Sequence, residues 1–348
     1  MTVKRLRLQN FTAFQNTEFE FSSGVNVLIG ANGTGKTHLM KVIYSILKAC
    51  ERAQLEHIES TEPLNKLFYD KLMGVFKPDS IGRLIYRAAG NNHADIHLEY
   101  ENSFLDIKLT TRKAFAVTHV GLPNPTPSIY LPNREFLSIS EGFIAAYQKR
   151  ETSLDETYYD LSVALNALPL LGPRLEEVKR LIDPLEEAIR GKVIQENGRF
   201  YVKLPEGKLE AQLVSEGYLK LAGLTYLIRN GSLTQNGILF WDEPEANLNP
   251  KLIPFVVKTL KVLAQSGIQI FLATHDYLLS QELSALAETQ KVSIKFFVLS
   301  KRYKRHSRDR EAGVSAEIGN TLAEIEHNPI VDEFAAYYDR QVENFQSS

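Results

Sequence analysis

The chain has 348 residues, of which 44% are hydrophobic and 24% charged, and its formal net charge is −2. This composition excludes a disordered or fibrous protein and leaves room for one large domain or a domain with a sizeable insertion. The near-zero net charge excludes a globally basic nucleic-acid binder, so any nucleic-acid contact would need a local patch.

The chain carries the features expected of a cytoplasmic protein. Its single cysteine, Cys50, cannot form an internal disulfide and suits a reducing compartment. Residues 1–11 lack the apolar core of a secretory signal, and no window approaches the 18 uncharged apolar residues of a membrane-spanning helix. We therefore expect no membrane segment.

The first fifty residues predict strands followed by a phosphate-binding loop. Period-two alternation in residues 3–21 predicts strands, the apolar run 25–30 predicts a buried strand, and residues 37–50 are helix-like. Between these elements the sequence fits G-x-x-x-x-G-K-[ST] in full. The loop consists of Gly30, Ala31, Asn32, Gly33, Thr34, Gly35, Lys36 and Thr37, and His38 follows it.

This loop predicts a site for a nucleoside triphosphate with Mg²⁺. Its glycines let backbone N–H groups curl around phosphates, and the following helix points its positive end at the anion. Lys36 is expected to reach the β- and γ-phosphates, and Thr37 to offer its hydroxyl to Mg²⁺.

The middle of the chain predicts two further units. Segments between residues 84 and 120 read as an antiparallel set, and "SIYL" (128–131) as a strand returning to the core. Residues 136–190 are expected to be mostly helical, with Pro184 interrupting the best candidate for a long helix, and a short hairpin follows. We expect a core in residues 1–135 and 205–348, and a helical insert in residues 136–204.

The last third alternates strands and helices, which predicts a mostly parallel sheet covered on both faces. The apolar run Ile238 to Trp241 predicts a buried strand, and Asp242 and Glu243 follow at its C-terminal end, where α/β sheets bind ligands. Asp242 is expected in the Mg²⁺ shell, and Glu243 is expected to accept a proton from the attacking water or to orient it. The simpler alternative is an acidic pair that only caps the next turn.

A second apolar strand, in "IQIFLATHD", ends in Ala273, Thr274 and His275. An imidazole at this edge can donate to a γ-phosphate and steady the attacking water, although a lone histidine after a strand is more often structural. "SEG" (Ser215, Glu216, Gly217) precedes a helix-like segment, and by itself it indicates only a helix cap.

Taken together, these motifs resemble the ABC-type ATPase heads of the SMC, RecF and OLD-nuclease group. The opening "RLRLQNFTAFQNTEFEFSSGVNVLIGANGTGKT" is similar to the start of such heads, "LVSEGYLKLAGL" to the signature, "DEPEANLNP" to a Walker B strand with its D-loop (Glu245 to Asn249), and "ATHD" to the H-loop. The resemblance covers roughly residues 1–50 and 205–300. It implies a P-loop NTPase fold of ABC type.

The resemblance also implies a mechanism. Such heads pair head to tail, and each ATP lies between the phosphate loop of one copy and the signature helix of the other, so Ser215, Glu216 and Gly217 would act in trans. The choice of adenine over guanine also comes from the resemblance. Three departures are evident: the signature is Ser-Glu-Gly, no Q-loop glutamine is found where Asn133, Arg134 and Glu135 stand, and the segment between the ABC motifs is too short for a long coiled-coil arm.

Two C-terminal segments have open interpretations. The basic run Lys301 to Arg310 is able to grip DNA or RNA, to dock an acidic partner, or to be only a solvated turn. Residues 328–345 read as an amphipathic helix whose aromatic face is expected to pack on the core, with a partner-docking face as the alternative.

The sequence thus predicts an ATPase (ATP and Mg²⁺) that forms a nucleotide-sandwich homodimer and acts as a switch or motor for a separate effector. A nuclease or toxin of a bacterial, antiviral defence system is the expected effector, because no nuclease constellation is evident in this chain. The alternatives are a RecF-like DNA repair ATPase, a non-hydrolysing ATP-binding scaffold or inhibitor of a partner, and the nucleotide subunit of a membrane transporter.

Overall fold

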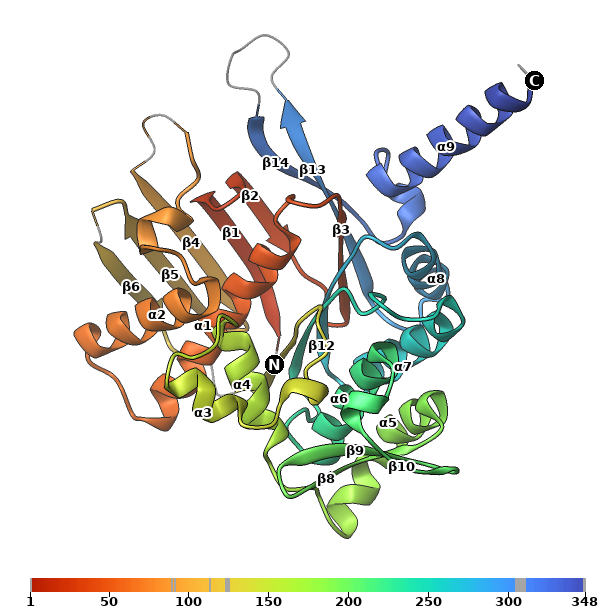
Figure 1. Ribbon diagram of the computed structural model, residues 1–348. Coiled ribbons are helices and arrows are strands. Elements are labelled where there is room, and N and C mark those ends of the chain that lie inside the picture. The colour runs from red at the N-terminus through yellow and green to blue at the C-terminus, as the bar shows by residue number, and fades with distance from the viewer. Residues whose placement is uncertain are drawn as a thin grey trace.

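The computed structural model describes residues 2–346 except 89, 91, 113, 123–125 and 304–310. Its described strands form three sheets, and helices lie between and around them (Figure 1). None of the helices in these residues has a stretch of 18 residues apolar enough to cross a bilayer.

The central sheet has six strands in the order β14-β13-β3-β12-β11-β7. All neighbouring pairs are parallel except β13 and β14, which are antiparallel. The strands are β3 (Val25–Gly30), β7 (Ser128–Leu131), β11 (Ile238–Asp242), β12 (Gln269–Thr274), β13 (Ile294–Tyr303) and β14 (Glu311–Gly319). Every residue of β3, β7, β11 and β12 is buried, as expected for parallel strands covered on both faces.

A five-stranded antiparallel sheet, in the order β2-β1-β4-β5-β6, stands beside the central sheet (Figure 1). Its strands are β1 (Val3–Phe11), β2 (Phe14–Glu20), β4 (His93–Tyr100), β5 (Ser103–Thr110) and β6 (Phe115–Val120). The buried face of this sheet shares one apolar core with α1 (Lys36–Leu55) and α2 (Thr61–Phe76). The antiparallel subdomain expected from residues 84–120 is therefore confirmed, and it includes the N-terminal strands.

One segment expected in that set, "RLIYRAAG" (83–90), is not a strand in its described residues. Residues 81–84 form the 3-10 helix η1 (Ile81–Leu84), and Ile85 makes only an isolated bridge to Phe11. The side chains of Ile81, Leu84 and Ile85 are all buried in the core that α2 covers. This short turn buries its apolar residues without joining the sheet, which periodicity alone does not distinguish from a strand.

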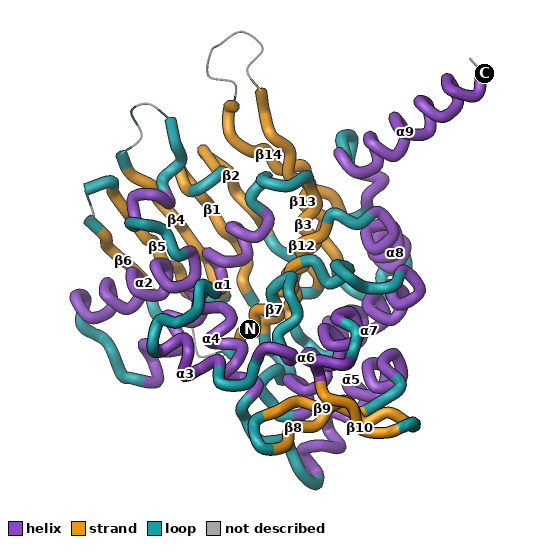
Figure 2. Tube along the Cα trace, in the orientation of Figure 1, coloured by secondary structure: helices purple, strands orange, loops and turns teal. Residues whose placement is uncertain are grey.

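The other face of the central sheet is covered by the segment that follows β7 (Figure 2). That segment contains η2 (Leu137–Ile139), α3 (Phe143–Gln148), α4 (Glu156–Leu165), α5 (Pro173–Ile189), the small sheet β8 (Lys192–Glu196), β9 (Arg199–Leu204) and β10 (Gly207–Glu210), η3 (Ala211–Leu213) and α6 (Glu216–Arg229). The expected limit of the insert at residue 204 falls between β9 and β10 of one sheet, and the division into core and insert stays a prediction.

The expected interruption at Pro184 is wrong, because α5 runs through it from Pro173 to Ile189. A proline removes one helical hydrogen bond, to the carbonyl four residues earlier. That residue, Arg180, lies on the exposed face of α5, where water can pair with its carbonyl. The buried stripe formed by Leu181, Ile182 and Leu185 holds the helix against its neighbours.

The remaining helices alternate with the last strands along the chain. Between β11 and β12 come η4 (Pro250–Leu252) and α7 (Ile253–Gln265), between β12 and β13 comes α8 (Tyr277–Glu288), and after β14 come η5 (Leu322–Glu324) and α9 (Pro329–Gln346). Helix α9 projects from the body of the molecule (Figure 1). Three of its aromatic side chains are exposed, with Phe334 at 54%, Tyr337 at 55% and Tyr338 at 70%. The expectation that this face packs on the core is therefore wrong for these three residues. Among the described side chains of α9, Ile330 packs against the core, and the ring of Phe334 lies 4.6 Å from that of Tyr277 on α8.

Candidate functional site

The phosphate loop joins β3 to α1 in a backbone conformation that only glycine adopts without strain. Gly30 has φ +155° and Gly35 has φ +94°. A Cβ on Gly30 would lie 2.4 Å from the carbonyl oxygen of Leu299, and one on Gly35 would lie 2.8 Å from the ring of Phe14. The glycines therefore let the loop turn tightly while β13 and β2 pack directly behind it.

Lys36 begins α1, and its ammonium group is folded back onto the loop. Nζ donates to the carbonyl oxygens of Gly30 at 2.6 Å and Ala31 at 3.2 Å. Burial lowers the pKa of this lysine, and the carboxylates of Glu243, Asp242 and Glu245 act in the opposite direction. A buried cation held only by carbonyl oxygens, with carboxylates nearby, is well placed to receive an anion.

Thr37 and Asp242 meet where β11 ends beside α1. The Thr37 hydroxyl donates to Oδ2 of Asp242 at 2.9 Å, and the Tyr130 hydroxyl donates to the same oxygen at 3.2 Å. Burial raises the pKa of Asp242, while these two hydrogen bonds favour its ionised form. A hydroxyl and a carboxylate are hard oxygen ligands of the kind Mg²⁺ takes alongside water and phosphate oxygens, so the donor set fits this ion.

Glu243 and His275 form a second pair at the same edge of the sheet. Nδ1 of His275 lies 3.1 Å from Oε1 of Glu243. Glu243 has a left-handed backbone, with φ +48°, and its N–H donates to the carbonyl of Ala273 at 2.9 Å. The turn thus aims the carboxylate toward His275 rather than along the strand.

Glu245 lies beneath His275 and was expected only as the first residue of the D-loop. Its Oε1 accepts from the Thr274 hydroxyl at 2.7 Å and from the backbone N–H of His275 at 3.2 Å. Its Oε2 is buried and has no partner among the described residues. Burial raises the pKa of this carboxyl. Glu245 therefore fixes the backbone that carries the imidazole.

Lys220 is a buried residue of the site that the sequence did not single out. It lies on α6, and its Nζ donates to the backbone carbonyl of Glu243 at 3.0 Å. Burial lowers its pKa against the attraction of Glu245, Glu243, Glu216 and Asp242. Lys220 thus joins the signature helix to the turn that carries Glu243, and its position one helical turn after Gly217 was the only available signal.

The signature residues contact the D-loop of their own chain. Ser215 caps α6 with an extended backbone and an exposed side chain, Glu216 accepts from the side-chain amide of Asn247, and a Cβ on Gly217 would lie 2.8 Å from the carbonyl oxygen of Asn247. In the part of the chain that the structure describes, no hydrogen bond or ion pair joins residues 215–217 to the phosphate loop. The roles of these three residues stay predictions.

The region searched for a Q-loop follows β7. Glu135 is buried and accepts from the backbone N–H of Ser138 at 3.2 Å and from its hydroxyl, so its carboxylate caps the turn η2. Asn133 and Arg134 are exposed. The residue in this region that contacts the site is Tyr130, which no motif indicated. Most of the basic run 301–310 lies outside the described residues.

The comparisons with known families agree with this fold. Residues 85–280, more than half of the chain, match the family described as "AAA domain, putative AbiEii toxin, Type IV TA system", and residues 1–119 match "AAA ATPase domain". The chain belongs to the first of these families. It is an SMC/RecF-like, ABC-type ATPase domain of the AAA group, as the motifs predicted.

Curated relatives match part of the chain. The chain is 26% identical over 179 residues to the DNA replication and repair protein RecF of Francisella tularensis subsp. holarctica (strain FTNF002-00 / FTA), covering 47% of this chain and 50% of that protein. It is 27% identical over 180 residues to RecF of F. tularensis subsp. novicida (strain U112), with the same coverage. The chain thus spans about half the length of the curated relatives it matches.

Two solved structures share the fold. The Smc head bound to the C-winged helix domain of ScpA has a TM-score of 0.56 at 12% identity, covering 92% of this chain and 98% of that one. The Smc head with an extended coiled coil bound to the C-terminal domain of ScpA, derived from Pyrococcus furiosus, has a TM-score of 0.51 at 14% identity, covering 96% and 99%.

Proposed function

We propose that this chain hydrolyses ATP with Mg²⁺, and that two copies enclose each nucleotide. The observation that carries the proposal is the meeting of two pairs, Thr37 with Asp242 and Glu243 with His275, at one edge of the sheet beside Lys36. A pure nucleotide binder has no need of the second pair, whereas hydrolysis needs a group that orients and deprotonates water.

Each residue has a role that fits its position. The loop 30–37 binds phosphates through its backbone, and Lys36 exchanges its two carbonyl contacts for the β- and γ-phosphate oxygens. Thr37 and Asp242 would hold Mg²⁺, which would neutralise phosphate charge when bound. Glu243 accepts the proton of the attacking water, and His275, oriented by Glu243 and Glu245, donates to the γ-phosphate.

The exposed apolar side chains near the site support a paired arrangement. Leu213 and Tyr218 flank the signature residues, and Tyr277 and Leu278 lie two and three residues after His275. They are 68%, 36%, 37% and 39% exposed, respectively. In a head-to-tail pair these side chains are covered, and the exposed Ser215 faces the γ-phosphate held by the partner.

Measurements of phosphate release and of molecular mass distinguish an ATPase from a non-hydrolysing scaffold. We expect wild type to release phosphate above background, and Glu243→Gln to lose release while ATP converts it into a dimer detectable by light scattering. Background release by wild type, alone and with DNA or RNA, favours the non-hydrolysing scaffold. A Glu243→Gln variant that stays monomeric at saturating ATP contradicts the sandwich.

We further propose that the ATPase drives a separate effector, such as a nuclease or toxin of a defence system. The family description, which names a putative toxin of a toxin–antitoxin system, favours this over the RecF-like repair role, although the RecF relatives keep repair as the second candidate. The neighbouring reading frame discriminates between them. Co-expression with a nuclease or toxin encoded there should make effector activity depend on Glu243, and a repair role predicts no such dependence.

The basic run 301–310 is proposed as a contact for DNA or RNA. Neutralising Arg302, Lys304, Arg305 and Arg308 is expected to lower DNA affinity and the slope of its salt dependence while leaving ATP affinity unchanged. Wild-type DNA binding by the quadruple variant would show that this run takes no part.

A further inference from the structure

Two buried tyrosines connect Asp242 with the surface of the helical segment. The hydroxyl of Tyr130, on β7, donates to Asp242, and its ring centroid lies 5.4 Å from that of Tyr44, on α1. The Tyr44 hydroxyl donates to Oδ2 of Asp160, on α4, at 2.7 Å. Tyr44 and Tyr130 are 1% and 2% exposed. Four elements, β11, β7, α1 and α4, are thus joined by a continuous line of contacts.

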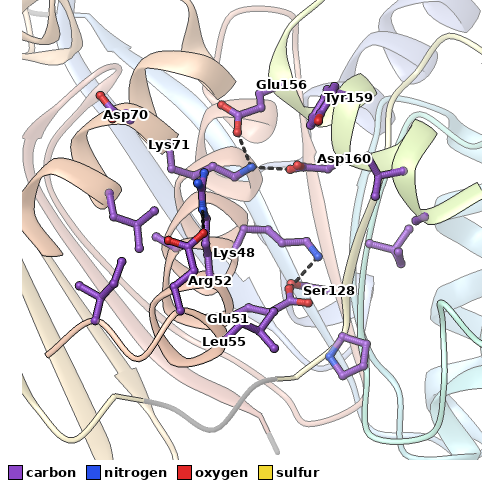
Figure 3. Close-up of a pocket in the computed structure, with 18 of the residues that line it drawn as sticks. Lys48, Glu51, Arg52, Leu55, Asp70, Lys71, Ser128, Glu156, Tyr159 and Asp160 are labelled. Atoms are coloured by element: carbon purple, nitrogen blue, oxygen red, sulfur yellow. Dashed lines mark hydrogen bonds and ion pairs between the residues drawn. The ribbon is translucent and has the colours of Figure 1, made fainter. Parts of the chain in front are cut away.

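The outer end of this line is an ion-pair cluster. Nζ of Lys71, on α2, lies 2.6 Å from Asp160 and 2.7 Å from Glu156 (Figure 3). These residues line a cleft of about 990 Å³ between α1, α2, α4 and the start of β7. Burial lowers the pKa of Lys71, but the two carboxylates outweigh it and the pKa is raised, so this lysine stays charged. Asp160 is therefore held at a fixed place while its surroundings are open to solvent.

Among the described residues, the Tyr44 hydroxyl bonds to Asp160 and the Tyr130 hydroxyl bonds to Asp242. Burial, together with Asp242 for Tyr130 and Asp160 for Tyr44, raises both tyrosine pKa values far above the ordinary value, so both side chains remain neutral donors. Deleting the Tyr130 hydroxyl leaves the buried carboxylate of Asp242 with one hydrogen bond fewer, which costs more than an exposed bond because water does not readily replace it. Asp160 lines the cleft, so water replaces the Tyr44 hydrogen bond more readily there.

The position of Tyr130 matters most when metal is bound. Thr37 and Tyr130 donate to the same oxygen of Asp242. Once the Thr37 hydroxyl turns toward Mg²⁺, Tyr130 is the remaining one of these two donors that holds the carboxylate. Tyr130 lies on β7, the edge strand of the central sheet. The ring of Tyr44, on the adjoining α1, packs against the ring of Tyr130 and supports it.

We propose that Tyr130 and Tyr44 are positioning residues that hold Asp242 for Mg²⁺ and connect it to Asp160. The Mg²⁺-dependent affinity for ATP then depends on the position of α4, the helix that carries Asp160 and lines the cleft. This inference rests on the proposed ATPase function. It assigns a series of contacts that connects α4 with Asp242, the proposed metal ligand, in a chain where no Q-loop glutamine is evident.

The test compares ATP affinity with Mg²⁺ and with EDTA, measured by isothermal titration calorimetry on the full chain. Tyr130→Phe is expected to weaken binding of Mg²⁺–ATP about 3- to 10-fold and to leave binding of metal-free ATP within about twofold. Tyr44→Phe acts in the same direction by a smaller factor. Tyr159→Phe is the matched control, because Tyr159 lines the same cleft on α4 but its hydroxyl accepts from Gln148 and its ring stacks on Tyr147.

Two substitutions of Asp160 separate its hydrogen bond from its charge. Asp160→Ala is expected to weaken Mg²⁺–ATP binding, whereas Asp160→Asn, which keeps an acceptor for Tyr44, restores most of it. Equal Mg²⁺–ATP affinity in wild type and both tyrosine variants overturns the inference, as does an equal loss with EDTA, which indicates general damage. Wild type that binds no ATP at all defeats the proposed function instead.

Discussion

The imidazole of His275 and the carboxylate of Glu243 are in direct contact, with 3.1 Å between Nδ1 and Oε1. The two residues come from neighbouring parallel strands, β12 and β11, so the sheet itself fixes their separation. The contact occupies Nδ1 and turns Nε2 of the ring away from Glu243; Nε2 donates to a phosphate oxygen when both ring nitrogens carry a proton. A donor and a base are thus assembled on one rigid edge.

His275→Ala should lower the turnover of ATP by about 10²-fold, as expected for the loss of one donor to developing phosphate charge. ATP affinity should change little, because the loop 30–37 supplies most of the binding. Steady-state phosphate release and calorimetry measure the two quantities. His327→Ala, at an exposed histidine outside the site, should behave as wild type, and unchanged turnover in His275→Ala would remove His275 from the mechanism.

Lys220→Met should reduce turnover by about tenfold while ATP affinity stays within about twofold. The substitution removes the donor to the Glu243 carbonyl, and the left-handed turn then loses a support worth about 1–2 kcal/mol. Phosphate release at saturating ATP checks the prediction. Lys251→Met, at an exposed lysine close to the D-loop, is the control. A loss of affinity equal to the loss of turnover would mean that Lys220 acts on binding instead.

Gly35→Ala should abolish measurable ATP binding, because its Cβ would collide with the ring of Phe14 and its φ is +94°. Gly142→Ala is a matched control. Gly142 also has a positive φ, +70°, but nothing lies within 4 Å of the added Cβ. The control should lose only about 1–2 kcal/mol of unfolding free energy and bind ATP normally. Calorimetry and thermal melting compare the two variants.

The stability of the wild type relative to Glu245→Gln should fall as pH rises. Burial raises the pKa of Glu245, so the folded state holds this proton more tightly than the unfolded state does. The contribution of Glu245 to the free energy of unfolding is therefore lost as pH rises from the unfolded pKa, about 4.3, to the raised folded pKa. Above the folded pKa this contribution stays constant. Melting temperatures of both proteins across this range provide the measurement, and parallel curves would contradict the prediction.

The sequence predicted the parts of the fold and site that are encoded locally. The phosphate loop, the strand before Asp242 and the strand before His275 each have a contiguous signal, and parallel strands bring their carboxyl ends to one edge. The central and antiparallel sheets are confirmed. The assigned roles of the site residues stay predictions, since bound nucleotide and turnover are what test them.

The features that the sequence did not reveal depend on contacts between distant segments. Tyr130 and Lys220 contact Asp242 and Glu243 across 112 and 23 residues, respectively, and no spacing rule connects them. Helix α5 continues through Pro184 because its buried stripe outweighs one lost hydrogen bond. The exposed aromatic face of α9 was misjudged because amphipathicity indicates an apolar face but not what covers it.

Strand β3 carries the phosphate loop, yet both of its neighbours in the sheet, β12 and β13, come from the last third of the chain. A ribosome adding 5–20 residues per second leaves this apolar strand unpaired for roughly 10 to 50 s during synthesis. The nascent protein must therefore be kept from aggregating until nearly all of it has emerged, and truncation before β12 should yield insoluble material rather than a smaller working unit.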